Sequence, residues 1–119
     1  MLISINFEPA DALILDEDIS LSNADGSFIG ENAGDVLGRQ VAFAGDVNGD
    51  GYDDILISSY VFDTAPSGGT DVGKIYLIFG NSTGQVKDMD VGNANASFIG
   101  EGQWNYAGLT LGGAGDVNG

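Results

Sequence analysis

The sequence predicts an all-β fold made of short antiparallel strands. Short apolar segments alternate with turn-rich stretches along the 119 residues, as expected for small strands joined by tight loops. The chain contains 20 Gly and only 2 Pro, a composition that suits many tight turns. No stretch keeps a sustained 3.6-residue apolar period, so we expect little helix.

An internal repeat gives the strongest evidence about architecture. Residues 18–49 and 88–119 align without gaps at an offset of 70 residues, and 15 of the 32 aligned positions are identical. Ser27-Phe28-Ile29-Gly30-Glu31 returns as Ser97-Phe98-Ile99-Gly100-Glu101, and the segment 44–49 returns unchanged as 114–119. Two identical blocks in one register indicate a repeated structural unit.

Four segments of the repeat have the character of strands. The first is apolar and bounded by glycine, the second is an apolar run that follows a turn cluster, and the third is rich in β-branched and aromatic residues. The fourth is shorter. In chain order they are residues 40–44, 54–59, 74–79 and 97–100, with turn-rich loops at 65–69 and 80–84.

Four short strands per repeat are typical of a β-propeller blade, a four-stranded antiparallel sheet. Residues 1–31 would supply the last strands of a preceding blade, residues 32–101 one full repeat, and residues 102–119 the start of a following blade. A closed propeller needs about 4–8 blades. With under two repeats, we expect an incomplete propeller that pairs with other blades, or with copies of itself, through open strand edges.

The composition excludes several classes of function. There are 18 Asp and Glu against 3 Lys and Arg, a formal charge of -15 that repels nucleic acids and anionic lipids. Cys and His are absent, which removes thiolate metal sites and the commonest general base. No apolar run is long enough for membrane insertion. No nucleophile with a base is visible, so we do not expect an enzyme.

The loop that follows the first strand carries the candidate site. Oxygen-bearing side chains stand at loop positions 1, 3, 5 and 9, and Gly49 and Gly51 allow a sharp turn. Calcium takes about 6–8 oxygen ligands, and short Asp and Asn side chains reach one point without distorting the backbone. The predicted ligands are Asp46, Asn48, Asp50, the carbonyl of Tyr52, and Asp54.

Two other interpretations of this loop are weaker. An EF-hand needs a bidentate Glu at loop position 12, which here is Ile57. A metal-free acidic turn would bring three carboxylates together without a cation to offset their repulsion. The second copy retains only Asp116 and Asn118 of the pattern, and we expect that partial site to be empty or weak.

The residues 38–57 and 74–80 resemble the FG-GAP repeat, the blade of the integrin alpha-subunit propeller and of related bacterial surface proteins. The resemblance covers most of residues 24–119. It implies a seven-bladed ring in the complete protein, with calcium (Ca2+) held by the same five residues. The Phe-Gly pair that names the family is Leu37-Gly38 in one copy and Ala107-Gly108 in the other.

Together these patterns predict a calcium-binding structural and interaction module. It would belong to an extracellular or cell-surface protein, as in cell adhesion, and present its loops to a protein or carbohydrate. An alternative is the non-catalytic propeller part of a secreted hydrolase or lyase. Trp104 and Tyr106 could form an exposed binding pair, but large aromatic residues are usually buried. We therefore expect them to fill the space between blades.

Overall fold

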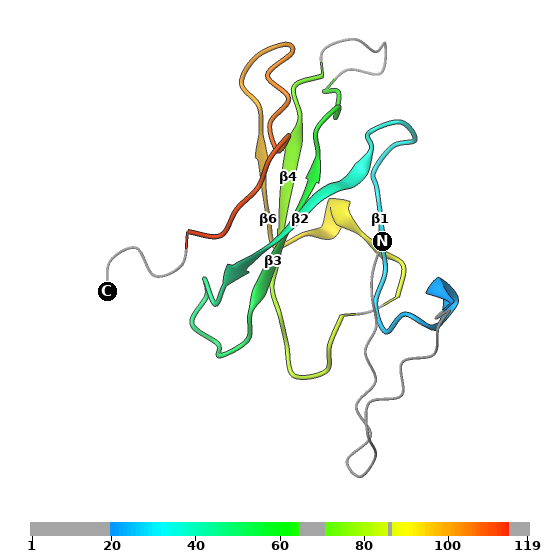
Figure 1. Cartoon of the computed structure of the whole chain (residues 1–119), viewed down its shortest axis with the longest axis vertical. Coiled ribbons are helices and arrows are strands. Elements are labelled where there is room, and N and C mark those ends of the chain that lie inside the picture. Colours follow the sequence, from blue (N-terminus) through cyan, green and yellow to red (C-terminus); the bar gives the residue numbers. More distant parts are fainter. Residues whose placement is uncertain (1–19, 65–70, 86, 115–119) are drawn as a thin grey trace.

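The computed structural model describes residues 20–64, 71–85 and 87–114. Its centre is a four-stranded antiparallel sheet in the order β2-β3-β4-β6 (Figure 1). The strands are β2 (Leu37–Gly45), β3 (Asp54–Ser59), β4 (Lys74–Ile78) and β6 (Ala96–Ile99). Each of the four predicted segments overlaps one of these strands. The all-β prediction and the four-stranded blade are therefore confirmed.

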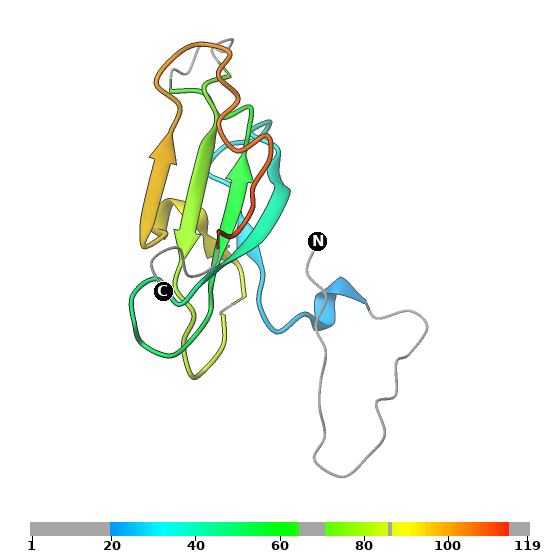
Figure 2. The same cartoon turned by 60° about the vertical axis from the view of Figure 1, so that its left-hand side comes forward.

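A smaller layer covers one face of this sheet. Strand β1 (Phe28–Ile29) pairs in parallel with β5 (Met89–Asp90), and the 3₁₀ turns η1 (Leu21–Asn23) and η2 (Val91–Asn93) lie next to them in the sequence. Figure 2 shows β1, β5 and η2 beside the sheet, with η1 further out toward the N-terminus. By the 70-residue offset, β1 corresponds to Phe98–Ile99 of β6. The boundaries of the three repeat segments remain predictions.

The hydrophobic core lies between the sheet and this smaller layer. Ile57, Tyr76, Ile78 and Val91 are buried there, and partly buried residues such as Phe28 and Met89 pack around them. Alternate residues of β4 are buried because successive side chains of a strand point to opposite faces. Among the described residues, no helix is long and apolar enough to cross a membrane.

Residues 107–108, in the segment predicted to start a following blade, lie against the opposite face of the sheet. Gly73 and Ala107 form a parallel bridge, and the N–H of Ala107 donates to the carbonyl of Val72 over 3.0 Å. Gly108 has φ +85, and a Cβ atom there would lie 2.7 Å from the Cβ of Ser58. Glycine is therefore required where this segment crosses the sheet.

The structure describes a single blade, so it remains a prediction that Trp104 and Tyr106 fill the space between blades; within this blade, Trp104 is not part of the core. Its side chain is 56% exposed, and Tyr106 is half-buried. Both residues have a left-handed backbone, with φ of 62 and 49. They lie on the loop that follows β6 at one end of the sheet, which carries Trp104 away from the core (Figure 1). The turns predicted at residues 65–69 lie outside the described residues.

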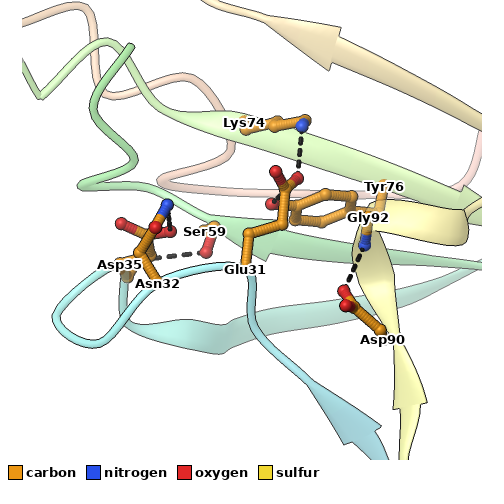
Figure 3. A network of polar contacts seen from close by, with 8 residues as sticks. All are labelled: Glu31, Asn32, Asp35, Ser59, Lys74, Tyr76, Asp90 and Gly92. Carbon is orange, nitrogen blue, oxygen red and sulfur yellow. Dashed lines mark hydrogen bonds and ion pairs between the residues drawn. The ribbon is translucent and has the colours of Figure 1, made fainter. Parts of the chain in front are cut away.

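A polar network fastens the connection between β1 and β2 to the sheet (Figure 3). Lys74 on β4 forms an ion pair with the Glu31 carboxylate, which also accepts a hydrogen bond from the Tyr76 hydroxyl over 3.0 Å. The Ser59 hydroxyl donates to the carbonyl of Asp35 over 3.1 Å. The Lys74 ammonium also lies 4.6 Å from the ring centroid of Phe62. Burial, followed by the effect of Glu31, raises the pKa of the Tyr76 hydroxyl, which therefore remains a donor.

We predict that Lys74→Met destabilises the chain by about 1–3 kcal/mol, because it leaves the Glu31 carboxylate without its cation. The double variant Glu31→Met/Lys74→Met should recover part of this loss, since no unpaired charge remains. Urea denaturation measures both free energies of unfolding. The matched control is Lys87→Met, which removes the same charge from an exposed side chain. Equal losses in the Lys74 and Lys87 variants would contradict the prediction.

Candidate metal centre

The candidate metal loop, residues 46–53, connects β2 to β3 at one end of the sheet (Figure 1). Gly45 and Asp54, the residues on either side of it, are paired across the two strands. Asp46 therefore begins the loop where β2 ends, and Asp54 is the first residue of β3. This hairpin brings the first and last predicted ligands back to the same pair of strands.

Asp46 organises the loop through backbone hydrogen bonds. Its Oδ1 accepts from the N–H groups of Gly49 and Asp50 over 2.7 and 3.0 Å, and its Oδ2 accepts from Gly51 over 2.8 Å. The N–H of Gly51, and then those of Gly49 and Asp50, lower the pKa of this carboxyl. Gly49 and Gly51 have φ of 78 and 91, the left-handed region in which glycine carries no Cβ penalty.

Asn48 and Asp50 continue the same pattern. The Oδ1 of Asn48 accepts from the N–H of Asp50 over 2.9 Å, and the Oδ1 of Asp50 accepts from the N–H of Tyr52 over 2.9 Å. Their side chains also touch, because the Asn48 amide donates to the Asp50 carboxylate over 2.8 Å. These local turns are the reason that Asn and Asp suit the positions.

Asp54 lies at the base of the loop and is fully buried. Its Oδ2 accepts from the N–H of Val47 over 2.8 Å, and its Oδ1 accepts from the N–H of Gly80 over 2.9 Å. Gly80 follows β4 after Phe79, and a Cβ atom there would lie 2.4 Å from the carbonyl oxygen of Asp53. The sequence pattern did not identify Val47 or Gly80, because the contact with Gly80 spans 26 residues.

The donor set of this loop fits a hard cation. It consists of carboxylate and amide oxygens, the ligands that calcium prefers. A carboxylate offers about four lone-pair sites, so those of Asp46 and Asp54 retain acceptor capacity beyond their hydrogen bonds to backbone N–H groups. In the described part of the chain, however, no group of three or more His, Cys, Asp or Glu residues is already arranged as a metal site. The carboxylates are turned toward backbone N–H groups instead.

Asp46, Asn48 and Asp50 share one turn, and Asp54 lies at its base. Each of these four side chains accepts a hydrogen bond from a backbone N–H group. Tyr52, whose carbonyl is a predicted ligand, has a side chain that is largely exposed. Asp116 and Asn118 of the second copy lie outside the described residues. The assignment of ligands therefore remains a prediction.

Comparisons with known proteins agree with the repeat. The family model for the FG-GAP repeat matches residues 37–78, which span β2, β3 and β4. The chain is similar to integrin alpha pat-2 of Caenorhabditis briggsae, at 32% identity over 94 residues, and to that of Caenorhabditis elegans, at 32% over 108 residues. The matches cover 78% and 85% of this chain but 7% and 8% of those proteins. No solved structure matches the chain.

We predict an acid-dependent stability that is specific to Asp46. Because its folded pKa lies below the usual value of 3.8, its carboxylate stabilises the fold above that pH, and the contribution is lost as the pH falls through the folded pKa. The stability difference between the wild type and Asp46→Asn should therefore be present at about pH 6 and shrink below about pH 4. Urea titrations in chelator measure it.

Asp53→Asn is the matched control, since Asp53 is an exposed neighbour that carries the same charge. Its stability difference from the wild type should change less with pH. If the Asp46→Asn difference stays constant across the acid range, the backbone hydrogen bonds of Asp46 do not hold the loop in solution.

Proposed function

Residues 37–78 form an FG-GAP repeat, and from this premise we propose that the chain is a calcium-stabilised segment of a β-propeller that serves as an interaction module. The observation that carries the proposal is the metal loop. It joins two strands of the blade and concentrates oxygen donors within nine residues, Asp46 to Asp54. The module would act by binding partners with its loops and would perform no chemistry of its own.

Asp46, Asn48, Asp50, Asp54 and the Tyr52 carbonyl would hold the calcium ion. The ion would supply positive charge between carboxylates that otherwise repel one another. The protein's own groups already shape the turn: Asp46 gathers three backbone N–H groups, and Asp54 ties the loop to the residue after Phe79. Rearrangement of a few side chains would therefore be enough to surround the ion, because hydrogen bonds already hold the backbone of the turn in place without it.

We propose an extracellular or cell-surface location. The chain resembles integrin alpha proteins, and its charge of -15 suits an environment rich in divalent cations. Calcium sites of extracellular modules have dissociation constants of about 10⁻⁴–10⁻³ M, which match such surroundings.

The proposed partners include further blades or other copies of this chain. β2 and β6 are the outer strands of the sheet, so each has an edge without a neighbouring strand within the described sheet. Apolar side chains are exposed on both strands, with Val41 and Phe43 on β2 and Phe98 and Ile99 on β6. Exposed apolar surface beside a strand edge favours pairing with another sheet.

We expect calcium to raise the thermal midpoint of the chain above its value in chelator. At about 10 mM calcium and a dissociation constant of about 10⁻⁴–10⁻³ M, linkage gives a stabilisation of about 1.4–2.7 kcal/mol. A thermal melt followed by circular dichroism, with calcium and with chelator, measures the shift. Magnesium should produce a smaller one, because it retains more of its water.

Charge-matched variants make this test specific. Asp50→Asn removes a predicted ligand charge, and Asp53→Asn removes the same charge from the adjacent exposed residue that is outside the ligand set. The calcium shift should disappear in Asp50→Asn and persist in Asp53→Asn. Absence of a shift in the wild type, or an equal loss in both variants, would rule out the proposed site.

A further inference from the structure

An aromatic cluster lies at the end of the sheet away from the metal loop (Figure 1). The rings of Trp104 and Tyr106 have centroids 6.3 Å apart, and those of Tyr106 and Tyr60 are 6.2 Å apart. The guanidinium carbon of Arg39 lies 5.4 Å from the Tyr60 ring centroid. We use the name aromatic cluster for these four residues. They come from three parts of the chain: the start of β2, the residue after β3, and the loop after β6.

The loop that carries Trp104, residues 100–106, has a counterpart at residues 30–36 in the first copy of the repeat. We call residues 30–36 the first loop and residues 100–106 the second loop. At the offset of 70 residues, Trp104 corresponds to Gly34 and Tyr106 to Val36. All four residues have positive φ, with 101 and 62 for the first pair and 54 and 49 for the second. Both loops also contain the same turn, because Asp35 N–H donates to the Asn32 carbonyl and Asn105 N–H to the Gly102 carbonyl. The two loops therefore follow one backbone path.

This comparison shows that Trp104 has an unfavourable backbone conformation that a glycine at the same position would adopt without strain. A left-handed conformation costs a non-glycine residue about 1–2 kcal/mol, whereas glycine adopts it freely. The first loop has Gly34 at this position, with open space where a Cβ atom would be. The second loop has a bulky indole there, and because this side chain is largely exposed, its burial contributes little stability. Strain at an exposed residue is an indication of function rather than of folding.

We infer that Trp104 would stay exposed beside a following blade. The first loop is followed by the complete sheet β2-β3-β4-β6, yet Gly34 and Val36 remain exposed beside it. Because the second loop has the same backbone, a blade placed after it would leave the Trp104 position exposed as well. The blade that precedes Trp104 is the described sheet itself. We therefore infer that the Trp104 side chain contacts a ligand and not a neighbouring blade.

Polar groups border the rings. The N–H of Tyr106 donates to the carbonyl of Asp71 over 3.1 Å. Loss of solvation, together with the charge and the hydrogen bond of the nearby Asp71 carboxylate, raises the pKa of the Tyr106 hydroxyl, which therefore remains protonated. Arg39 adds guanidinium N–H donors at the other end of the row. Trp104 is exposed, Tyr60 and Tyr106 are partly buried, and such a row of rings between hydrogen-bonding groups matches a ligand with apolar C–H faces and hydroxyl edges.

We propose that the aromatic cluster binds a neutral oligosaccharide, with sugar rings stacked on Trp104 and Tyr106 and hydroxyl groups bonded by Asp71, Arg39 and the tyrosines. The chain's charge of -15 disfavours sulfated or carboxylated chains. The inference deepens the proposed function, since it names a ligand class for loops that the module presents. It uses residues that are not part of the metal loop.

Trp104 provides its own reporter, because it is the only tryptophan in the chain. The probes are cellohexaose, laminarihexaose, mannohexaose and chitohexaose, with heparin oligosaccharide as the anionic comparison. The full chain is titrated in calcium-containing buffer while tryptophan emission is recorded. We expect a saturable change in emission with at least one neutral oligosaccharide and a weaker response to heparin.

The variants test the ring positions by isothermal calorimetry with the responding oligosaccharide. Trp104→Gly introduces the residue of the sister loop and relieves the backbone strain, so the fold should be kept while affinity falls at least about tenfold. Tyr106→Phe keeps the ring and removes the hydroxyl, and it should weaken binding less. Phe43→Ala is the control, since it removes the most exposed of the large apolar side chains, at 73%, from the far end of β2.

Circular dichroism spectra of each variant verify folding. If Trp104→Gly fails to fold, Tyr60→Ala takes its place as the ring deletion. The proposal is overturned if no neutral oligosaccharide changes the emission, or if Phe43→Ala weakens binding as much as Trp104→Gly. It is also overturned if light scattering shows that Trp104 instead mediates self-association.

Melts with calcium and with chelator on the same samples separate this inference from the proposed function. A calcium shift without oligosaccharide binding refutes the inference alone. Oligosaccharide binding without a calcium shift refutes the metal site alone.

Discussion

The buried carboxylate of Asp54 is the constraint on which the rest of the blade depends. Removing an ionised group from water is costly unless hydrogen bonds compensate it, and here two backbone N–H groups do so. One belongs to Val47 in the metal loop and the other to Gly80 beyond β4. The side chain therefore joins the hairpin β2–β3 to the end of β4. It fixes the loop against the end of β4, in addition to the pairing of Gly45 with Asp54 at the base of the hairpin.

The opposite end of the sheet is fixed by a different device. Lys74 and Tyr76 on β4 hold Glu31, which lies just after β1, and so attach a segment that precedes the blade to its central strands. Between the two ends, the alternating burial of β4 keeps Tyr76 and Ile78 in the core. The sheet thus acts as a spacer that holds the metal loop at one end and the aromatic cluster at the other.

Local patterns made the strands and the turn between β2 and β3 predictable, whereas contacts between distant residues were not predictable. Segment 54–59 coincides with β3 because an apolar run bounded by turn residues has few alternatives. The spacing of Asp46, Asn48 and Asp50 indicated one turn, and these residues do share one. The partnership of Glu31 with Lys74 spans 43 residues and carries no local signal. Trp104 was expected to be buried because large aromatic residues usually are, and neither its exposure nor its left-handed backbone can be read from residue type.

The two copies of the loop after the fourth strand show how one backbone path can carry different side chains. Turn hydrogen bonds and alternating left-handed residues set the same path in both loops, although their side chains differ. A path determined by the backbone can accept Gly34 in one copy and Trp104 in the other without disturbing the sheet. Side chains at these positions can therefore differ between the two copies, whereas Asp54, Lys74 and Tyr76 are tied to the fold. A strained tryptophan can persist at such a position because the neighbouring strands, and not the loop, supply the stability of the blade.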